Sequence, residues 1–209
     1  MNAHDGARAM ARLAAPVAVV LGLAACAAHA PAIGAGPSAI SLAVANVTAP
    51  AGTTLVQACT PTGPELCFNA IDDNCNGVID EGCGEPTGLL QFTAAWGDSA
   101  ADVNLTVVTP TGERIPNGRA RSLPSGFTAG RDCPGEDRCD GQNVENVAFD
   151  GLEPPRGHYA VEVALVDLHG AEAPVKVHVG VRIGGRVYGF EADLAPGDEA
   201  KRLFSFDLP

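Results

Sequence analysis

Strict alternation over Val175–Ile183 constrains the fold of this chain more than any other feature. Valine or isoleucine occupies every odd position of this stretch, whereas the even positions carry Lys, His, Gly and Arg. A period of two places one face of a strand against a core and the other face outward. Gly184-Gly185 follows directly and suits a two-residue hairpin turn, so residues 186–192 are expected to return as the neighbouring strand.

The remainder of residues 88–209 repeats this pattern between turn residues. Further strands are expected at residues 89–96, 103–108, 159–165 and 203–208. Turns at Gly97-Asp98 and at Pro110-Thr111-Gly112 would allow the first two of these strands to pair. The 25 Gly and 16 Pro among 209 residues disfavour long helices. We therefore predict an all-β fold, an antiparallel β-sandwich of about seven strands.

Residues 1–25 have the order of a bacterial signal peptide. Arg8 and Arg12 precede an apolar run over residues 13–23, which as a helix would span about 16 Å, too short to cross a membrane. The tetrapeptide Leu23-Ala24-Ala25-Cys26 then resembles the lipobox of bacterial lipoproteins.

The lipobox resemblance implies that Cys26 receives a diacylglycerol and becomes the first residue of the mature protein. Ala27, in place of the Asp that retains such proteins at the inner membrane, implies the outer membrane of a Gram-negative bacterium. Acyl chains would anchor the chain with about 0.8 kcal/mol for each buried methylene. The alternative is simple secretion with cleavage after Ala30, which Pro31 disfavours. Residues 26–58 are expected to form a tether, with a first strand over residues 41–47 as the alternative.

Six cysteines remain once Cys26 is assigned to lipid, and an even number suits disulfides in an oxidising compartment. They are Cys59, Cys67, Cys75, Cys83, Cys133 and Cys139. Cys133 and Cys139 are expected to pair because they close a short loop, whereas the first four allow three connectivities. A zinc site is the competing interpretation, but close C-x2-C spacing and an intervening His are missing between residues 59 and 83.

An acidic loop begins at Asp72 and follows the start of the calcium-loop pattern D-x-[DN]-x-[DN]-G. The predicted oxygen donors are Asp72, Asn74, Asn76, the carbonyl of Val78 and Asp80. Cys83 stands where a full EF-hand loop has its bidentate Glu, so the expected calcium affinity is weak, roughly 10⁻⁴ to 10⁻³ M. The alternative is a disulfide-stapled acidic turn that holds no metal.

Residues 67–84, with Cys67-Phe68-Asn69-Ala70-Ile71 before the loop and Cys83 after it, resemble the MopE-type metal-binding motif. That resemblance implies a cysteine-bracketed module, here over residues 59–84, in an exported protein. The motif offers no His or Met ligand, and its carboxylate and amide oxygens suit calcium better than copper.

The later part of the chain resembles a YfaP-type or pre-peptidase-type β-sandwich domain over residues 88–209. The resemblance is carried by Trp96 and by residues 102–105, 110–113, 145–147 and 155–163. It implies a noncatalytic module similar to carbohydrate-binding sandwiches. The insert from Cys133 to Cys139 replaces the Gly-rich run that is usual before residue 145.

Asp98, Asp102 and Asn104 form a second candidate calcium group, to which Asp132 or Glu145 would add a carboxylate. Because Asp102 and Asn104 are two positions apart, they share one face of a strand, and simple solvation of that face is the alternative.

The function expected from these features is that of a noncatalytic, membrane-anchored lipoprotein that serves binding, adhesion or structure in the cell envelope. A formal net charge of −12 argues against nucleic acid as a partner, which leaves a protein or glycan. No G-x-S-x-G or H-E-x-x-H motif occurs, and no organic cofactor is expected. The alternatives are an envelope enzyme or its accessory subunit, which would need a cleft with perturbed carboxylates, and a metal-scavenging lipoprotein.

Overall fold

Eleven strands and no helix make up the part of the chain that the structure, a computed structural model, describes. The described residues are 42–49, 54–56, 59, 61, 63–115, 125–134, 139, 141–198 and 200–209. None of them belongs to a helix with the length and apolar character needed to cross a membrane. The predicted signal peptide, Cys26 as the predicted site of lipidation, and the first part of the predicted tether lie outside the described residues.

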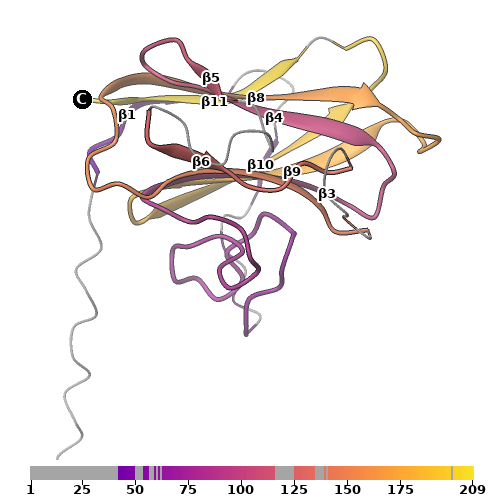
Figure 1. The fold of residues 1–209 in the computed structure, drawn as a ribbon, viewed down its shortest axis with the longest axis horizontal. Helices are drawn as coiled ribbons and strands as arrows, with labels where there is room; N and C mark the ends of the chain where they lie inside the picture. The colour runs from indigo at the N-terminus through magenta and orange to yellow at the C-terminus, as the bar shows by residue number, and fades with distance from the viewer. Residues whose placement is uncertain are drawn as a thin grey trace, which may run out of the picture. The chain divides into compact units, whose positions relative to one another are not determined.

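The strands pair into two antiparallel sheets that lie face to face (Figure 1). The five-stranded sheet has the order β1-β11-β8-β4-β5, with strands β1 (Ala45–Thr48), β11 (Lys201–Leu208), β8 (Gly157–Asp167), β4 (Asp102–Val108) and β5 (Arg114–Ile115). The six-stranded sheet has the order β2-β10-β9-β3-β7-β6, with strands β2 (Thr54–Val56), β10 (Arg186–Leu194), β9 (Val175–Ile183), β3 (Leu90–Gly97), β7 (Asn143–Phe149) and β6 (Phe127–Ala129). The predicted all-β fold and antiparallel β-sandwich are confirmed.

Alternate residues of the facing strands fill the space between the sheets. The odd-numbered residues of β9 are buried, as the period of two predicts. Aromatic rings join the two layers. The ring centre of Phe92 on β3 lies 6.3 Å from that of Phe206 on β11, and the Phe206 ring stacks on Tyr159 of β8 with the ring centres 5.0 Å apart. Burial of a ring of this size contributes about 1.5–3 kcal/mol. Pairing of Ile183 with Arg186 confirms the predicted hairpin between β9 and β10.

The predicted pairing of the two strands that flank Gly97-Asp98 is wrong. β3 belongs to the six-stranded sheet and β4 to the five-stranded sheet, so the chain crosses between layers at this turn. The indole N–H of Trp96 donates to the carbonyl of Ala101 at 2.7 Å and thereby ties the two ends of the crossing.

The strand count is eleven where the sequence predicted about seven. The additional strands are mostly short edge strands, which carry too few residues to show a period. β7 is long enough, but every one of its residues is buried. A strand buried on both faces shows no alternation of apolar and polar residues. The period of two therefore did not predict a strand at β7.

The tether predicted for residues 26–58 does not reach residue 58. Its second half supplies β1, which pairs with β11, and β2, which pairs with β10. The side chain of Asn46 donates to the Asp207 carboxylate at 2.6 Å, and the hydroxyls of Thr48 and Ser205 share a hydrogen bond of 2.6 Å. The alternative was a first strand over residues 41–47 docked on the main domain; the structure has a docked strand, with the bounds Ala45–Thr48.

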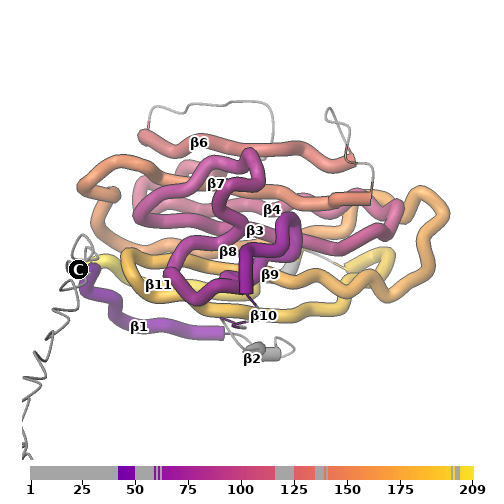
Figure 2. The backbone as a smooth tube through the Cα atoms, turned by 90° about the horizontal axis from the view of Figure 1, so that it is seen from below, coloured from indigo at the N-terminus to yellow at the C-terminus, as the bar shows by residue number. Residues whose placement is uncertain are grey.

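β3 is buried on both faces, although one of these faces points away from the core. The outward residues Gln91 and Thr93 are both fully buried, as is Asn146 on the adjacent β7. The oxygen of the Asn146 side chain accepts the Thr93 hydroxyl at 2.6 Å. Another part of the chain must therefore cover this face, and Figure 2 shows residues 63–88 lying across it.

Candidate functional site

The covering segment, here called the acidic module (residues 63–88), contains neither a helix nor one of the named strands. Two interleaved disulfides, Cys59–Cys75 and Cys67–Cys83, fix its backbone, with Cα separations of 5.3 and 5.4 Å. The structure thereby selects one of the three connectivities that the sequence left open. Each bridge spans a sequence separation of 16, and a loop of this length corresponds to about 3 kcal/mol in the chain-entropy model.

Glu65 holds three backbone N–H groups of the acidic module. Its Oε1 accepts from Asp80 at 2.8 Å, and its Oε2 accepts from Asp73 at 3.1 Å and from Asn74 at 3.4 Å. Burial raises the pKa of Glu65 to about 7, the Glu81 carboxylate adds to the rise, and the three N–H donors oppose it. The carboxyl group satisfies backbone donors that a helix or sheet would otherwise satisfy.

Asp80 was predicted as a cation ligand, but its carboxylate is directed to a different turn. Its two oxygens accept the N–H groups of Asn69 at 3.2 Å and Ala70 at 3.1 Å, and the residue is fully buried. Burial raises the pKa of Asp80 to about 6, while the N–H donors lower it. Ala70 has a φ of 60°, so Asp80 stabilises a turn with a left-handed non-glycine residue.

The acidic loop (residues 72–83) gathers three of the predicted ligands. Asp72 accepts the N–H groups of Asn76 at 3.0 Å and Gly77 at 2.8 Å. The side-chain amides of Asn74 and Asn76 both donate to Oε1 of Glu81. The structure therefore brings together Asp72, Asn74 and Asn76, and it adds Glu81 to them.

Glu81 is the residue of this site that the sequence pattern missed. It stands at the tenth position of the loop, to which the EF-hand template assigns no ligand. Its only signal in the sequence was a second acid next to Asp80. Its Oε2 is buried and has no hydrogen-bond partner. Burying a carboxylate oxygen without a partner is costly, so this atom favours a cation beside it.

The donor chemistry of the loop fits calcium. The carboxylates of Asp72 and Glu81 and the amide oxygens of Asn74 and Asn76 are ligands that suit a hard cation. In the structure both amides direct their NH2 groups to Glu81, so each amide would have to turn to offer its oxygen to an ion at Glu81. Val78, whose carbonyl was a predicted donor, gives its N–H to Oδ1 of Asn76 at 2.8 Å. Across the described residues, no group of three or more His, Cys, Asp or Glu side chains is placed to hold a metal ion. A cation in this loop therefore depends on the amide oxygens.

Gln91 attaches the acidic module to the sandwich. Its amide donates to the carbonyl of Ile79 at 2.7 Å and accepts the N–H of Ile79 at 3.4 Å, and both residues are fully buried. On the adjacent strand β9, a Cβ at Gly180 would lie 2.3 Å from the carbonyl oxygen of Ala70. Glycine at this position permits the close approach of the two backbones.

Arg131 joins the acidic module to the insert that the predicted Cys133–Cys139 disulfide closes. That disulfide is present, as expected. The guanidinium of Arg131 lies 4.4 Å from the ring centre of Phe68, and its Nε lies 3.2 Å from the Glu85 carboxylate. The backbone N–H of Arg131 donates to the same carboxylate at 3.1 Å. The insert therefore supports the acidic module.

The second predicted calcium group is only partly assembled. Asp102 and Asn104 share one face of β4 and are both partly exposed, as their spacing predicted. Asp98 is exposed in the turn after β3. Burial raises the pKa of Asp102, and the Asp132 carboxylate raises it further. Asp167, the cross-strand partner of Asp102 on β8, is a second acidic neighbour that raises this pKa.

Glu145 of β7 lies inside the sandwich, where its carboxyl group accepts the N–H of Leu105 at 2.6 Å. Burial raises the pKa of Glu145 to about 10, the Leu105 N–H lowers it, and the carboxylates of Asp132 and Asp102 raise it. Glu145 therefore carries a proton at neutral pH and serves as a neutral hydrogen-bonding group.

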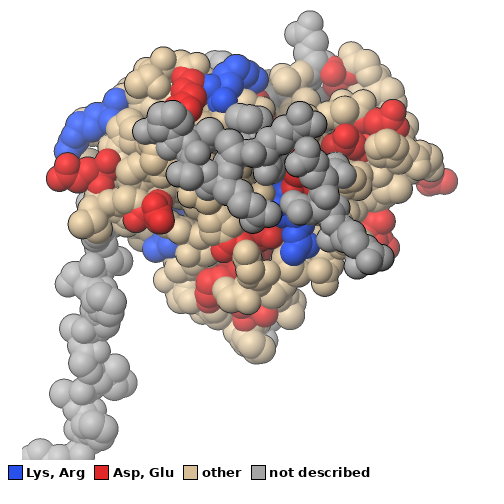
Figure 3. Space-filling model, in the orientation of Figure 1, with Lys and Arg blue, Asp and Glu red and all other residues tan. Residues whose placement is uncertain are grey.

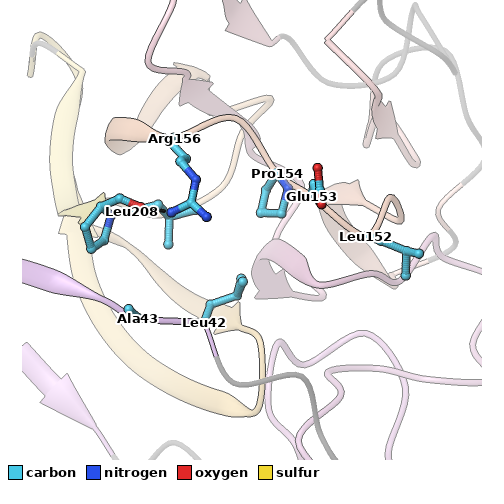
Figure 4. Close-up of a pocket in the computed structure, with 8 residues that line it drawn as sticks. Leu42, Ala43, Leu152, Glu153, Pro154, Arg156 and Leu208 are labelled. Carbon is cyan, nitrogen blue, oxygen red and sulfur yellow. Dashed lines mark hydrogen bonds between the residues drawn. The ribbon is translucent and has the colours of Figure 1, made fainter.

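A groove of about 280 Å³ opens at the end of the sandwich beside β1 (Figure 4). Leu42 and Ala43 lie on one side, Leu208 lies at the end of β11, and the turn with Leu152 and Pro154 lies opposite. The charged residues Glu153 and Arg156 line it beside these apolar residues, and the predicted ligands take no part in it.

A second groove, of about 260 Å³, runs between the acidic module and the outer face of the sheet. Phe68 and Asn69 form one side, His178 of β9 contributes to the other, and Ala95 of β3 lines it as well. Nε2 of His178 is buried without a hydrogen-bond partner and lies 3.5 Å from the Glu191 carboxylate. Burial lowers the pKa of His178, which favours the neutral ring.

Fold and site together define an antiparallel β-sandwich with a disulfide-stapled acidic module on the outer face of one sheet. Comparison of the chain with models of known families, with curated proteins and with solved structures found no match. The resemblances to the MopE-type motif and to the YfaP-type domain stay predictions.

Proposed function

We propose that this chain is a noncatalytic lipoprotein of the bacterial cell envelope, whose sandwich binds a protein or glycan and whose acidic loop takes calcium weakly. The observation that carries the proposal is the pairing of the cysteines. All six that follow Cys26 form disulfides within the fold. Of seven cysteines, this leaves Cys26 for lipid, at the end of a signal-peptide sequence.

The disulfides also support the proposed location. Disulfides persist in exported proteins and are rare in the reducing cytosol. An exported chain whose Cys26 stands in a lipobox would be held at a membrane by acyl chains. Ala27 after this cysteine supports the outer membrane of a Gram-negative host.

Calcium at the acidic loop is supported by the orphaned Oε2 of Glu81. Asp72, Asn74, Asn76 and Glu81 would hold the ion, which would supply positive charge to a module that is rich in carboxylates. Figure 3 shows acidic side chains on this part of the surface. Two carboxylates with two amides give few charged ligands, so the affinity should lie in the weak range of roughly 10⁻⁴ to 10⁻³ M.

Binding of a protein or glycan is supported by the groove beside the acidic module. Its lining combines Phe68 and Ala95 with the polar groups of Asn69 and His178. An apolar surface edged by a few polar groups suits a ligand with both characters, such as a sugar ring or an aromatic side chain.

The alternative of an envelope enzyme has one observation in its favour, which is the pair of raised pKa values at Asp102 and Glu145. Perturbed carboxyl groups of this kind occur at catalytic sites. However, Glu145 is fully buried and accepts the backbone N–H of Leu105. A structural role therefore accounts for its perturbed pKa.

Metabolic labelling with a palmitate analogue tests the proposal directly. The wild-type chain should incorporate the label and fractionate with membranes, whereas Cys26→Ser should lose both properties. The matched control is the double variant Cys133→Ser/Cys139→Ser, which removes cysteines but should keep the label. A soluble, unlabelled wild-type protein that begins at Pro31 would establish simple secretion and overturn the lipid anchor.

A further inference from the structure

A basic side chain of the sandwich, that of Arg182 on β9, belongs to the sheet face that carries the acidic module. Arg182 is the cross-strand partner of Gln91, the residue that binds Ile79 of the acidic module. Side chains of directly paired residues lie on the same face of a sheet. Arg182 therefore extends from the face that the acidic module covers, next to the docking contact.

The hairpin between β9 and β10 fixes the direction of this side chain. Nε of Arg182 donates to the carbonyl of Gly184 at 2.9 Å. The tip of the acidic loop meets the same hairpin, since a Cβ on Gly77 would lie 3.8 Å from the carbonyl oxygen of Gly185. The rest of the guanidinium is thus held where the hairpin and the loop meet.

The charges of two loop carboxylates affect this guanidinium, although no direct ion pair joins them among the described side chains. Burial lowers the pKa of Arg182, and the carboxylates of Asp72 and Glu81 raise it. An arginine side chain stays charged in proteins at all ordinary pH values. The same two carboxylates are the only charged ligands proposed for calcium, and one oxygen of Glu81 is left without a hydrogen-bond partner.

We propose that Arg182 is a built-in counter-ion of the acidic loop, which competes with calcium for Asp72 and Glu81 and keeps calcium binding weak. This inference rests on the proposed calcium loop. The guanidinium supplies one positive charge that is covalently part of the chain. This charge reduces the repulsion between the loop carboxylates, so the loop stays folded without a metal. A divalent ion that enters must share the two carboxylates with this fixed charge.

Calorimetric titration of calcium into the whole chain, purified in detergent, tests the role of Arg182. Arg182→Gln removes the charge and keeps an amide able to donate to Gly184. It should bind calcium about tenfold more tightly, or better, because like charges repel strongly at an effective dielectric of about 20. Arg182→Lys keeps the charge and should bind within about threefold of the wild type.

The matched control is Arg186→Gln, which removes a charge from the same hairpin. Arg186 pairs with Ile183, whose side chain points to the core side, so it leaves the sheet on the face opposite to Arg182. It should leave the calcium affinity within about twofold of the wild type, since an exposed charge is screened. Calcium should also raise the melting temperature of Arg182→Gln more than that of the wild type.

Two results would contradict the inference, and they are distinguishable. Equal calcium affinities for the wild type, Arg182→Gln and Arg186→Gln would overturn the role of Arg182 and leave the calcium loop intact. No calcium binding by any of the proteins would overturn the calcium loop itself, and the role of Arg182 with it.

Discussion

The contact between Gln91 and Ile79 gives the sharpest prediction about how the acidic module is held on the sandwich. Both residues are fully buried, and one side-chain amide serves both the N–H and the C=O of Ile79. Gln91→Leu keeps the volume of the side chain and removes both hydrogen bonds. It leaves a buried backbone donor and acceptor with no partner from the sheet.

The size of the effect follows from the two bonds. A buried polar group left unsatisfied costs about 1–3 kcal/mol. The 2.7 Å bond to the Ile79 carbonyl should account for most of this, and the longer 3.4 Å bond for less. Gln91→Leu should therefore destabilise the docked state by about 2–4 kcal/mol. Gln91→Ala should cost more, because it also leaves a cavity.

Two measurements separate loss of docking from general unfolding. Hydrogen exchange at the Ile79 amide reports on the acidic module, and fluorescence of Trp96, the single tryptophan, reports on the core during urea unfolding. We expect exchange at Ile79 to quicken by a factor of about 30 or more, from the free-energy change above. The exposed Gln142→Ala variant should match the wild type in both measurements. The reasoning is refuted if Gln91→Leu leaves both the Ile79 protection and the urea midpoint unchanged.

Three further predictions concern the carboxyl groups and the disulfides. Glu81→Gln should weaken calcium binding about tenfold or more by calorimetry, because it removes one of two charged ligands. Asp80→Asn should change the calcium affinity little, since Asp80 faces a different turn. A larger loss of affinity for Asp80→Asn than for Glu81→Gln would restore Asp80 as the ligand. Burial raises the pKa of Glu145 from its ordinary value of 4.5 to about 10 in the fold, so the native state holds the Glu145 proton more tightly than the unfolded state does. The stability that this protonation contributes is complete below pH 4.5 and is lost as pH rises towards 10. Glu145→Gln mimics the protonated acid and should have a flatter melting temperature between about pH 5 and 9 than the wild type; parallel pH profiles would contradict this assignment. Replacement of Cys67 and Cys83 by Ser should lower the free energy of unfolding of the acidic module by about 3 kcal/mol. Hydrogen exchange in the acidic module should increase while Trp96 emission stays native. A simultaneous loss of the native Trp96 emission would show that the acidic module and the sandwich unfold as one.

The sandwich was predictable because its information is local. The alternation in β9 and the turn at Gly184-Gly185 fix a strand and a hairpin without reference to the rest of the chain. The short spacing of Cys133 and Cys139 made their disulfide predictable for the same reason. By contrast, β7 gave no period of two, since the core buries one of its faces and the acidic module covers part of the other.

The candidate site was predictable in composition but not in arrangement. The calcium-loop pattern identified Asp72, Asn74 and Asn76; the structure places Asn74 and Asn76 on Glu81, and Asp72 on the backbone N–H of Asn76. It could not show that Asp80 turns to the amides of Asn69 and Ala70, because that depends on how the disulfides fold the chain back. Conformation within an irregular segment is set by contacts distant in sequence, and no periodicity records them.

The sequence by itself determined the all-β class, the turn positions, an even set of cysteines after Cys26 and the oxygen-rich character of the loop. Tertiary structure decided the disulfide connectivity, the burial of Gln91, and the pairing of Arg182 with Gln91 on the face that the acidic module covers. The physical reason is that period and spacing encode local geometry, whereas burial and charge pairing depend on which surfaces meet. Docking of the acidic module buries the outward face of β3, where Gln91 and Thr93 lie.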